Sequence, residues 1–157
     1  MVAGPGEYEV RGAIIQGISS FHDSERGKSR GRNTVFILEM DSLRLAHLGD
    51  IGHMPDAKLM EALKGVDVLF LPVGGHSTIT PEEAAQVVRQ LRPRVAIPMH
   101  YATGTSRSPL CGVERFLKAV GAGTGEGDNS TVARPRLSVS LSTLPPAPQI
   151  VVLDCSR

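Results

Sequence analysis

Three residues of types that bind metal ions follow apolar stretches of this sequence: His22, Asp50 and His100. Each comes just after a β-rich run, where regular structure gives way to a loop. Because parallel strands deliver functional groups at their carboxyl ends, three such ends would supply two imidazoles and a carboxylate at one point. That donor set suits a divalent transition metal. Each residue also has a plainer interpretation, as an exposed loop histidine, a turn aspartate or a half-buried histidine. The hypothesis of a site therefore depends on the three together.

A second polar segment, His76-Ser77-Thr78, follows two glycines at another strand exit. Such a loop is suited to face a ligand with its backbone and side chains, and the alternative is a flexible connector to the next helix. The remaining histidines favour simpler roles. His53 is expected on the surface, with a supporting role beside Asp50 as the alternative. His47 alternates with leucines on one strand face, which favours core packing.

A basic cluster lies just after His22 and consists of Arg26, Lys28, Arg30 and Arg32. Its glycines and charges predict a mobile, solvated loop. The sharper hypothesis is that this loop closes over an anionic substrate carrying a phosphate or a carboxylate.

Length and composition predict one domain over residues 1–157, of the soluble globular class, with 41% hydrophobic and 21% charged residues. A net charge of +1 provides no field to recruit nucleic acid or an acidic membrane, and 4% aromatic residues provide little for base stacking. No apolar run approaches the ~20 residues needed to cross a bilayer, so no membrane association is expected. The N-terminus lacks a signal-peptide pattern, and the two cysteines lie far apart. We therefore expect a cytoplasmic protein with reduced thiols.

Periodicity predicts an α/β layered fold with a mixed sheet. Thr80, Pro81 and Glu83 form a strong helix start, with a cap, a first-turn proline and a capping box. Residues 122–135 are rich in glycine and polar residues and predict a surface loop. The expected helices are Asp56–Leu63, Pro81–Leu91 and Val113–Val120, and the expected strands are Glu7–Val10, Ala13–Ser20, Thr34–Met40, Leu43–His47, Val66–Pro72, Arg94–Pro98, Leu137–Leu141 and Ile150–Asp154.

Six stretches, in this order and spacing, resemble the metallo-β-lactamase fold family, and specifically its ascorbate-6-phosphate-lactonase-like hydrolases. They are Gly4-Pro5-Gly6-Glu7-Tyr8-Glu9-Val10, Ser20-Phe21-His22-Asp23, His47-Leu48-Gly49-Asp50-Ile51-Gly52-His53, Leu71-Pro72-Val73-Gly74-Gly75-His76, Pro81-Glu82-Glu83-Ala84-Ala85 and Ile97-Pro98-Met99-His100-Tyr101. The resemblance covers about residues 4–103 and implies an αββα sandwich with one or two metal ions at one edge of its sheets.

The resemblance also implies roles for individual residues. His22 matches a ligand of the first metal, Asp50 matches the carboxylate that bridges both metals and orients the attacking water, and His100 matches a ligand of the second. His76 and its neighbours match a substrate-facing loop. Zinc is the usual metal, with manganese or iron in some members. The implied reaction is hydrolysis of an ester, lactone, amide or phosphoester of a small molecule by metal-activated water.

One departure from the family is large: no two histidines here are separated by a single residue, so the His-x-His-x-Asp-His signature is absent. In the family that signature lies upstream of the segment matching Gly4–Glu7. We therefore expect a partial domain, the C-terminal portion of the fold. A catalytic zinc usually takes three protein ligands and water. Here each of the two metals would keep two ligands, or one ion would use His22, Asp50 and His100 together and bind weakly.

A partial sandwich also predicts an exposed apolar sheet face, covered in a homo-oligomer or by a complementing chain. The alternative function is a non-catalytic, truncated relative that acts as an interaction module. A third interpretation, a nucleic-acid processing relative, draws on the basic loop. The near-neutral charge counts against it.

Overall fold

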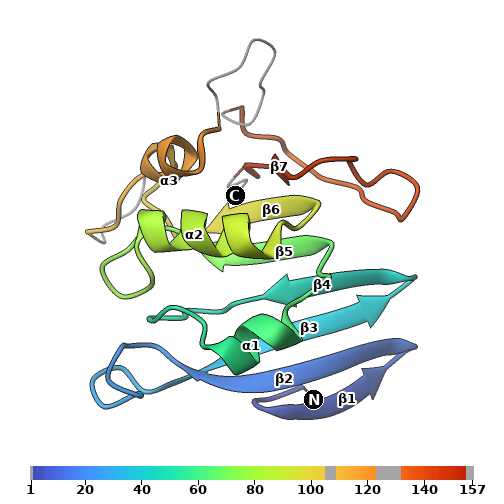
Figure 1. Ribbon diagram of the computed structural model, residues 1–157, viewed down its shortest axis with the longest axis horizontal. Helices are drawn as coiled ribbons and strands as arrows, with labels where there is room; N and C mark the ends of the chain where they lie inside the picture. The colour runs from blue at the N-terminus through green and yellow to red at the C-terminus, as the bar shows by residue number, and fades with distance from the viewer. Residues whose placement is uncertain (1, 105–108, 123–131, 155–157) are drawn as a thin grey trace.

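The computed structural model describes residues 2–104, 109–122 and 132–154. These residues form one mixed sheet and three helices (Figure 1). The strands are β1 (Gly6–Val10), β2 (Ala13–Phe21), β3 (Arg32–Met40), β4 (Leu43–His47), β5 (Val68–Pro72), β6 (Val95–Met99) and β7 (Gln149–Ile150), and the helices are α1 (Ala57–Ala62), α2 (Pro81–Leu91) and α3 (Val113–Val120).

The strands lie in the sheet in the order of the sequence, β1 to β7. Neighbours from β1 to β4 are antiparallel, and those from β4 to β7 are parallel. Consequently β2, β4, β5 and β6 all run in the same direction. The segments that follow these four strands therefore meet at one end of the sheet, on the left in Figure 1.

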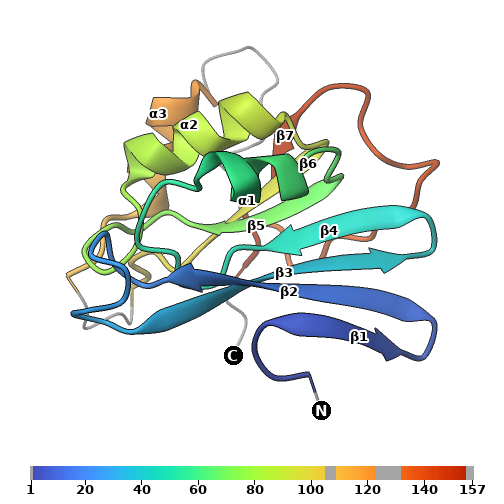
Figure 2. The same ribbon diagram turned by 60° about the horizontal axis from the view of Figure 1, so that its bottom comes forward.

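All three helices cover one face of the sheet, as Figures 1 and 2 show from two directions. The main core lies between them and includes fully buried residues from both layers, such as Leu69 of β5, Val87 of α2 and Phe116 of α3. The predicted capping box at α2 is confirmed: Thr80 Oγ1 accepts from the N–H of Glu83, and the Glu83 carboxylate accepts from the N–H of Thr80. These caps satisfy donors that the first turn leaves unpaired.

The opposite face of β5 and β6 is covered by the chain's own C-terminal segment. Leu137, Val139 and Leu144 pack there against Val95 and its buried neighbours. The predicted strand Leu137–Leu141 is wrong, because this segment packs by its apolar side chains and turns at Ser140 without pairing in the ladder. The predicted last strand is also shorter than expected, with only Gln149–Ile150 in the sheet. Most of the predicted loop 122–135 lies outside the described residues.

The same face over β1 to β4 carries apolar side chains that are only partly buried. The register places Tyr8, Ile15, Leu38 and Leu45 in one row across it, and each is half-buried. Met40, which the alternation places on the same face, is 48% exposed. The described chain thus has one sheet and one helical layer, half of the expected sandwich. Among the described residues, no helix is long and apolar enough to cross a membrane.

Candidate metal-binding site

The loops after β2, β4 and β5 are tied together at the carboxyl end of the sheet. The N–H of Gly52 donates to the carbonyl of Phe21 over 3.0 Å, which joins the loop after β4 to the end of β2. The N–H of Ile79 donates to the carbonyl of Ile51 over 2.9 Å, which joins the loop after β5 to the same segment. The predicted site residues therefore lie on one connected loop cluster.

Two glycines allow these loops to touch the backbone of the predicted ligands. A Cβ atom at Gly52 would overlap the carbonyl group of His22 and the nitrogen of Asp23. A Cβ atom at Gly74 would overlap the carbonyl oxygen of His100. Only a residue without a Cβ atom allows such close approach of two backbones.

Asp50 and His100 come together across this end of the sheet. The distance from His100 Nε2 to Asp50 Oδ1 is 4.0 Å, and the two side chains are 32% and 51% exposed. That distance is too long for a direct hydrogen bond. It is also longer than the roughly 3.4 Å that separates a nitrogen and an oxygen bound about 2.0–2.2 Å from the same tetrahedral zinc ion, so the two side chains would have to move closer to share one ion. His100 also has a positive φ of 53°, which lies outside ordinary strand geometry and directs it away from β6.

His22, directly after β2, is half-buried, and its Nε2 atom is buried. Within the described residues, neither His22 Nε2 nor the buried Nδ1 of His100 has a hydrogen-bond partner. A buried polar nitrogen without a partner is costly, and metal coordination would satisfy the Nε2 of His22. In His100 the unpaired nitrogen is Nδ1, whereas the atom that faces Asp50 is Nε2. The donor types therefore fit a metal ion. However, no three His, Cys, Asp or Glu side chains of the described chain form one ligand group. The structure joins Asp50 with His100 and leaves His22 apart.

Asn33, at the start of β3, holds the backbone on both sides of Gly49. Its Oδ1 accepts from the N–H of Asp50 over 3.0 Å, and its Nδ2 donates to the carbonyl of Leu48 over 2.8 Å. The same amide donates to the hydroxyl of buried Ser20 over 2.9 Å. Asn33 was not predicted from the sequence, because a polar residue after a charged loop looks like part of that loop.

Asp23 organises the loop between β2 and β3. Its carboxylate accepts the backbone N–H groups of Glu25, Gly27, Ser29 and Arg30 at 2.7–3.1 Å. Burial raises the pKa of Asp23, but the four backbone donors outweigh it and lower that pKa to about 2. The sequence analysis treated this loop as mobile, whereas the structure shows a turn closed around one carboxylate. An aspartate that bonds the N–H two residues later is the local signal that would have indicated it.

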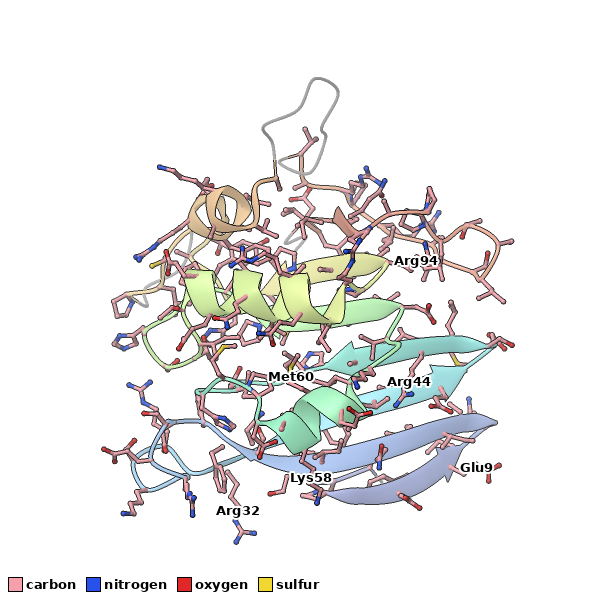
Figure 3. All side chains as sticks on the ribbon, viewed as in Figure 1. Glu9, Arg32, Arg44, Lys58, Met60 and Arg94 are labelled. Atoms are coloured by element: carbon pink, nitrogen blue, oxygen red, sulfur yellow. The ribbon has the colours of Figure 1, made fainter. Side chains whose placement is uncertain are left out.

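The arginines of the basic cluster point to different parts of the structure. Arg30 Nη1 donates to the carbonyl of His76 over 3.0 Å, so the loop after β2 contacts the loop after β5. Arg32 extends beyond β2 and away from β4, β5 and β6 (Figure 3). The cluster therefore does not act as a single patch.

The predicted substrate loop lies beside this contact. His76 is exposed and has a positive φ of 58°, and Ser77 is half-buried. Thr78 is buried, and its hydroxyl donates to the carbonyl of Gly75 over 3.3 Å. The exposed part of the loop is thus His76, while Thr78 holds the turn.

His47 differs from its predicted role in the core. It lies on the sheet face opposite the helices and is exposed, with its ring stacked 5.8 Å from that of Phe70. Its Nδ1 accepts from the N–H of Gly49 over 3.1 Å. Desolvation lowers the pKa of His47, although the charge of Asp50 opposes this shift. His53 is half-buried, and its Nε2 accepts from the N–H of Phe21 over 3.4 Å, so it supports the backbone next to His22.

Comparison with known proteins identifies the fold. Residues 1–100 match the family model described as a β-lactamase superfamily domain. A protein of Thermotoga maritima, assigned to the Zn-dependent hydrolases of the metallo-β-lactamase superfamily, matches with 33% identity and a TM-score of 0.74 over 97% of this chain and 70% of its own. The chain belongs to the metallo-β-lactamase superfamily. The α/β fold expected from the resemblance is confirmed.

Sequence relatives agree with this assignment. A UPF0173 metal-dependent hydrolase of Thermococcus onnurineus is 39% identical over 119 residues, which cover 74% of this chain and 52% of the relative. A UPF0173 metal-dependent hydrolase of Pyrococcus abyssi is 40% identical over 118 residues, with the same coverage of both chains. The chain spans about half the length of the curated relatives it matches.

Proposed function

We propose that this protein takes part in metal-dependent hydrolysis of a small-molecule ester, lactone or phosphoester. The observation that carries the proposal is the pair Asp50 and His100, with 4.0 Å between carboxylate and imidazole at the end of the sheet. The Nε2 of His22, which is buried without a hydrogen-bond partner among the described residues, is a further donor of the right chemistry. The names of the relatives support the proposal, since they are called metal-dependent hydrolases.

In this proposal Asp50, His100 and His22 hold one or two divalent ions, with zinc favoured over manganese and iron. A divalent ion held there would lower the pKa of a bound water, so that hydroxide is available at neutral pH, and would stabilise the oxyanion that develops. Asp50 would contribute a carboxylate that orients that water, and His100 would contribute its Nε2 as a ligand. Because the described residues form no group of three ligands, we expect the chain alone to bind metal weakly.

The substrate would lie against the loop after β5, contacting His76, Ser77 and Thr78. Exposed His76 provides the polar contact, and buried Thr78 keeps the turn in place. Arg30, bonded to the carbonyl of His76, adds a positive charge at this position. These features support a place for the chain among the ascorbate-6-phosphate-lactonase-like hydrolases and favour an anionic substrate.

The test is hydrolysis of nitrophenyl carboxylate, nitrophenyl phosphodiester and lactone probes with added zinc or manganese. The unmodified chain should turn over at least one probe in a metal-dependent manner, and Asp50→Ala should abolish that turnover. Glu61→Ala is the matched control, because Glu61 lies exposed on α1. Equal turnover by the Asp50→Ala variant would refute the proposal. Absence of turnover in every variant would favour the alternative, a non-catalytic interaction module.

We also propose that a second polypeptide covers the sheet face over β1 to β4. The half-buried row of Tyr8, Ile15, Leu38 and Leu45 supports this, because apolar side chains on an open face favour association. Light scattering at micromolar concentration should detect a homo-oligomer or a stable complex with a complementing chain. A monodisperse monomer that binds no complementing chain would contradict the proposal.

A further inference from the structure

Asn33 contacts the backbone of residues 48–50, whose geometry sets the direction of the Asp50 carboxylate. Its side-chain amide accepts from the N–H of Asp50 and donates to the carbonyl of Leu48. It therefore hydrogen-bonds to the peptide groups on both sides of Gly49. Gly49 has a φ of 60°, and a glycine loses more conformational freedom than other residues when it is fixed. The two hydrogen bonds from Asn33 fix this otherwise freely rotating link.

The fit between Asn33 and Gly49 is mutual. A Cβ atom at Gly49 would overlap Asn33 Oδ1, so the glycine makes room for the amide that holds it. Only an amide offers both a donor and an acceptor in this planar arrangement, because a carboxylate accepts but does not donate. Asn33 is itself fixed, since its Nδ2 also bonds Ser20, which is 2% exposed and faces it across the β2–β3 ladder.

We propose that Asn33 is a positioning residue that sets the Asp50 carboxylate opposite His100 and thereby sets metal affinity. This inference rests on the proposed function of Asp50 and His100 as ligands. Ligands must be held close to their productive geometry by residues that are themselves locked in place. Loss of such supporting hydrogen bonds typically weakens metal binding by roughly 10–100-fold. Asn33 therefore acts through the backbone of Asp50 and does not itself touch the ion.

The experiment compares Asn33→Asp and Asn33→Ala with two controls. Asn33→Asp keeps an acceptor for the N–H of Asp50 but places a carboxylate oxygen against the carbonyl of Leu48. Ser20→Ala removes the third bond of Asn33 while leaving both bonds to the loop. Asp67→Asn weakens a bond to the N–H of Arg44 at the opposite end of the sheet, and so controls for loss of stability alone.

Binding of Mn²⁺ and Zn²⁺ is measured by isothermal titration, and exchange of the Asp50 amide hydrogen by NMR. Both Asn33 variants should raise the metal Kd at least tenfold, and Asn33→Ala, which removes the acceptor, should accelerate exchange of the Asp50 amide. Asp67→Asn should lower Tm without changing either quantity, and Ser20→Ala should change them much less than Asn33→Ala. Unchanged Kd in the Asn33 variants, with metal bound by the unmodified chain, would overturn the positioning role.

The amide measurement separates this inference from the proposed function. If the unmodified chain binds neither metal, the assignment of Asp50 and His100 as ligands fails. Hydrogen exchange of the Asp50 amide then tests by itself whether Asn33 holds the loop. Exchange that stays slow in Asn33→Ala would show that Asn33 does not hold the loop, which overturns the inference independently of any metal.

Discussion

Replacing Gly52 by alanine tests whether close loop packing holds His22 and Asp50 in register. The added Cβ would overlap backbone atoms of His22 and Asp23, which cannot rotate aside as a flexible side chain can. Because carbon atoms pack best at about 3.5–4.0 Å, the two loops must separate by roughly 1 Å. That movement also strains the hydrogen bond from Gly52 to Phe21.

The cost follows from the effect of overpacking. Forcing extra carbon atoms into a packed site costs about 1–3 kcal/mol. For a chain of this size, each kcal/mol lowers Tm by roughly 2–4 °C, so we expect a fall of roughly 2–12 °C. The assay is thermal unfolding followed by circular dichroism, with metal affinity measured on the same samples by isothermal titration.

Gly104→Ala is the matched control for Gly52→Ala. No described heavy atom lies within 4 Å of a Cβ built at Gly104, so this substitution should leave the free energy of unfolding within about 0.5 kcal/mol. Gly52→Ala should also weaken metal binding, whereas Gly104→Ala should not. If the two variants share the same Tm and the same metal Kd, the reasoning from loop contact is refuted.

Two further predictions concern the loop after β2 and the start of α2. The pKa of Asp23 is about 2 in the fold against 3.8 ordinarily, so its stabilising contribution is complete above about pH 4 and is lost as pH falls toward 2. Asp23→Asn should therefore lower the free energy of unfolding at pH 7 and flatten its acid dependence between pH 4 and 2 in denaturant titrations. If the free energy of unfolding of Asp23→Asn depended on pH between 4 and 2 as that of the unmodified chain does, the four backbone donors would not be what lowers the pKa of Asp23. Thr80→Ala should destabilise the protein by about 1 kcal/mol in the same titrations, whereas Thr80→Ser, which keeps the capping hydroxyl, should not. Equal loss in both Thr80 variants would argue against the cap.

The strands and helices could be predicted where local pattern and tertiary environment agree. Helix α2 is marked by Thr80, Pro81 and Glu83, and it begins and ends as expected. Leu137–Leu141 has the alternation of a strand, but Leu137 and Val139 are already buried in part by packing on the face of β5 and β6, without pairing in the ladder. Alternation of apolar and polar residues indicates that one side of a segment is buried, but it does not indicate that the segment pairs with a neighbouring strand.

The candidate site could be predicted only in part, for a similar reason. As expected from the sequence, the carboxyl ends of β4 and β6 bring Asp50 and His100 to the same end of the sheet. Whether His22 joins them depends on loop paths that no local pattern records, and it lies outside any group of three ligands within the described chain. Asn33 was missed because its importance arises from Gly49, sixteen residues away, with which it shares no sequence motif.

Anomalous diffraction can show whether Asp50 and His100 hold a divalent metal. Crystals of the protein soaked with Zn²⁺ or Mn²⁺ would be measured on both sides of the metal absorption edge. We expect an anomalous peak within bonding distance of the Asp50 carboxylate and His100 Nε2, and we expect Asp50→Ala crystals to lack it. A peak held only by other residues, or no peak at this position in well-ordered crystals with excess metal, would contradict it.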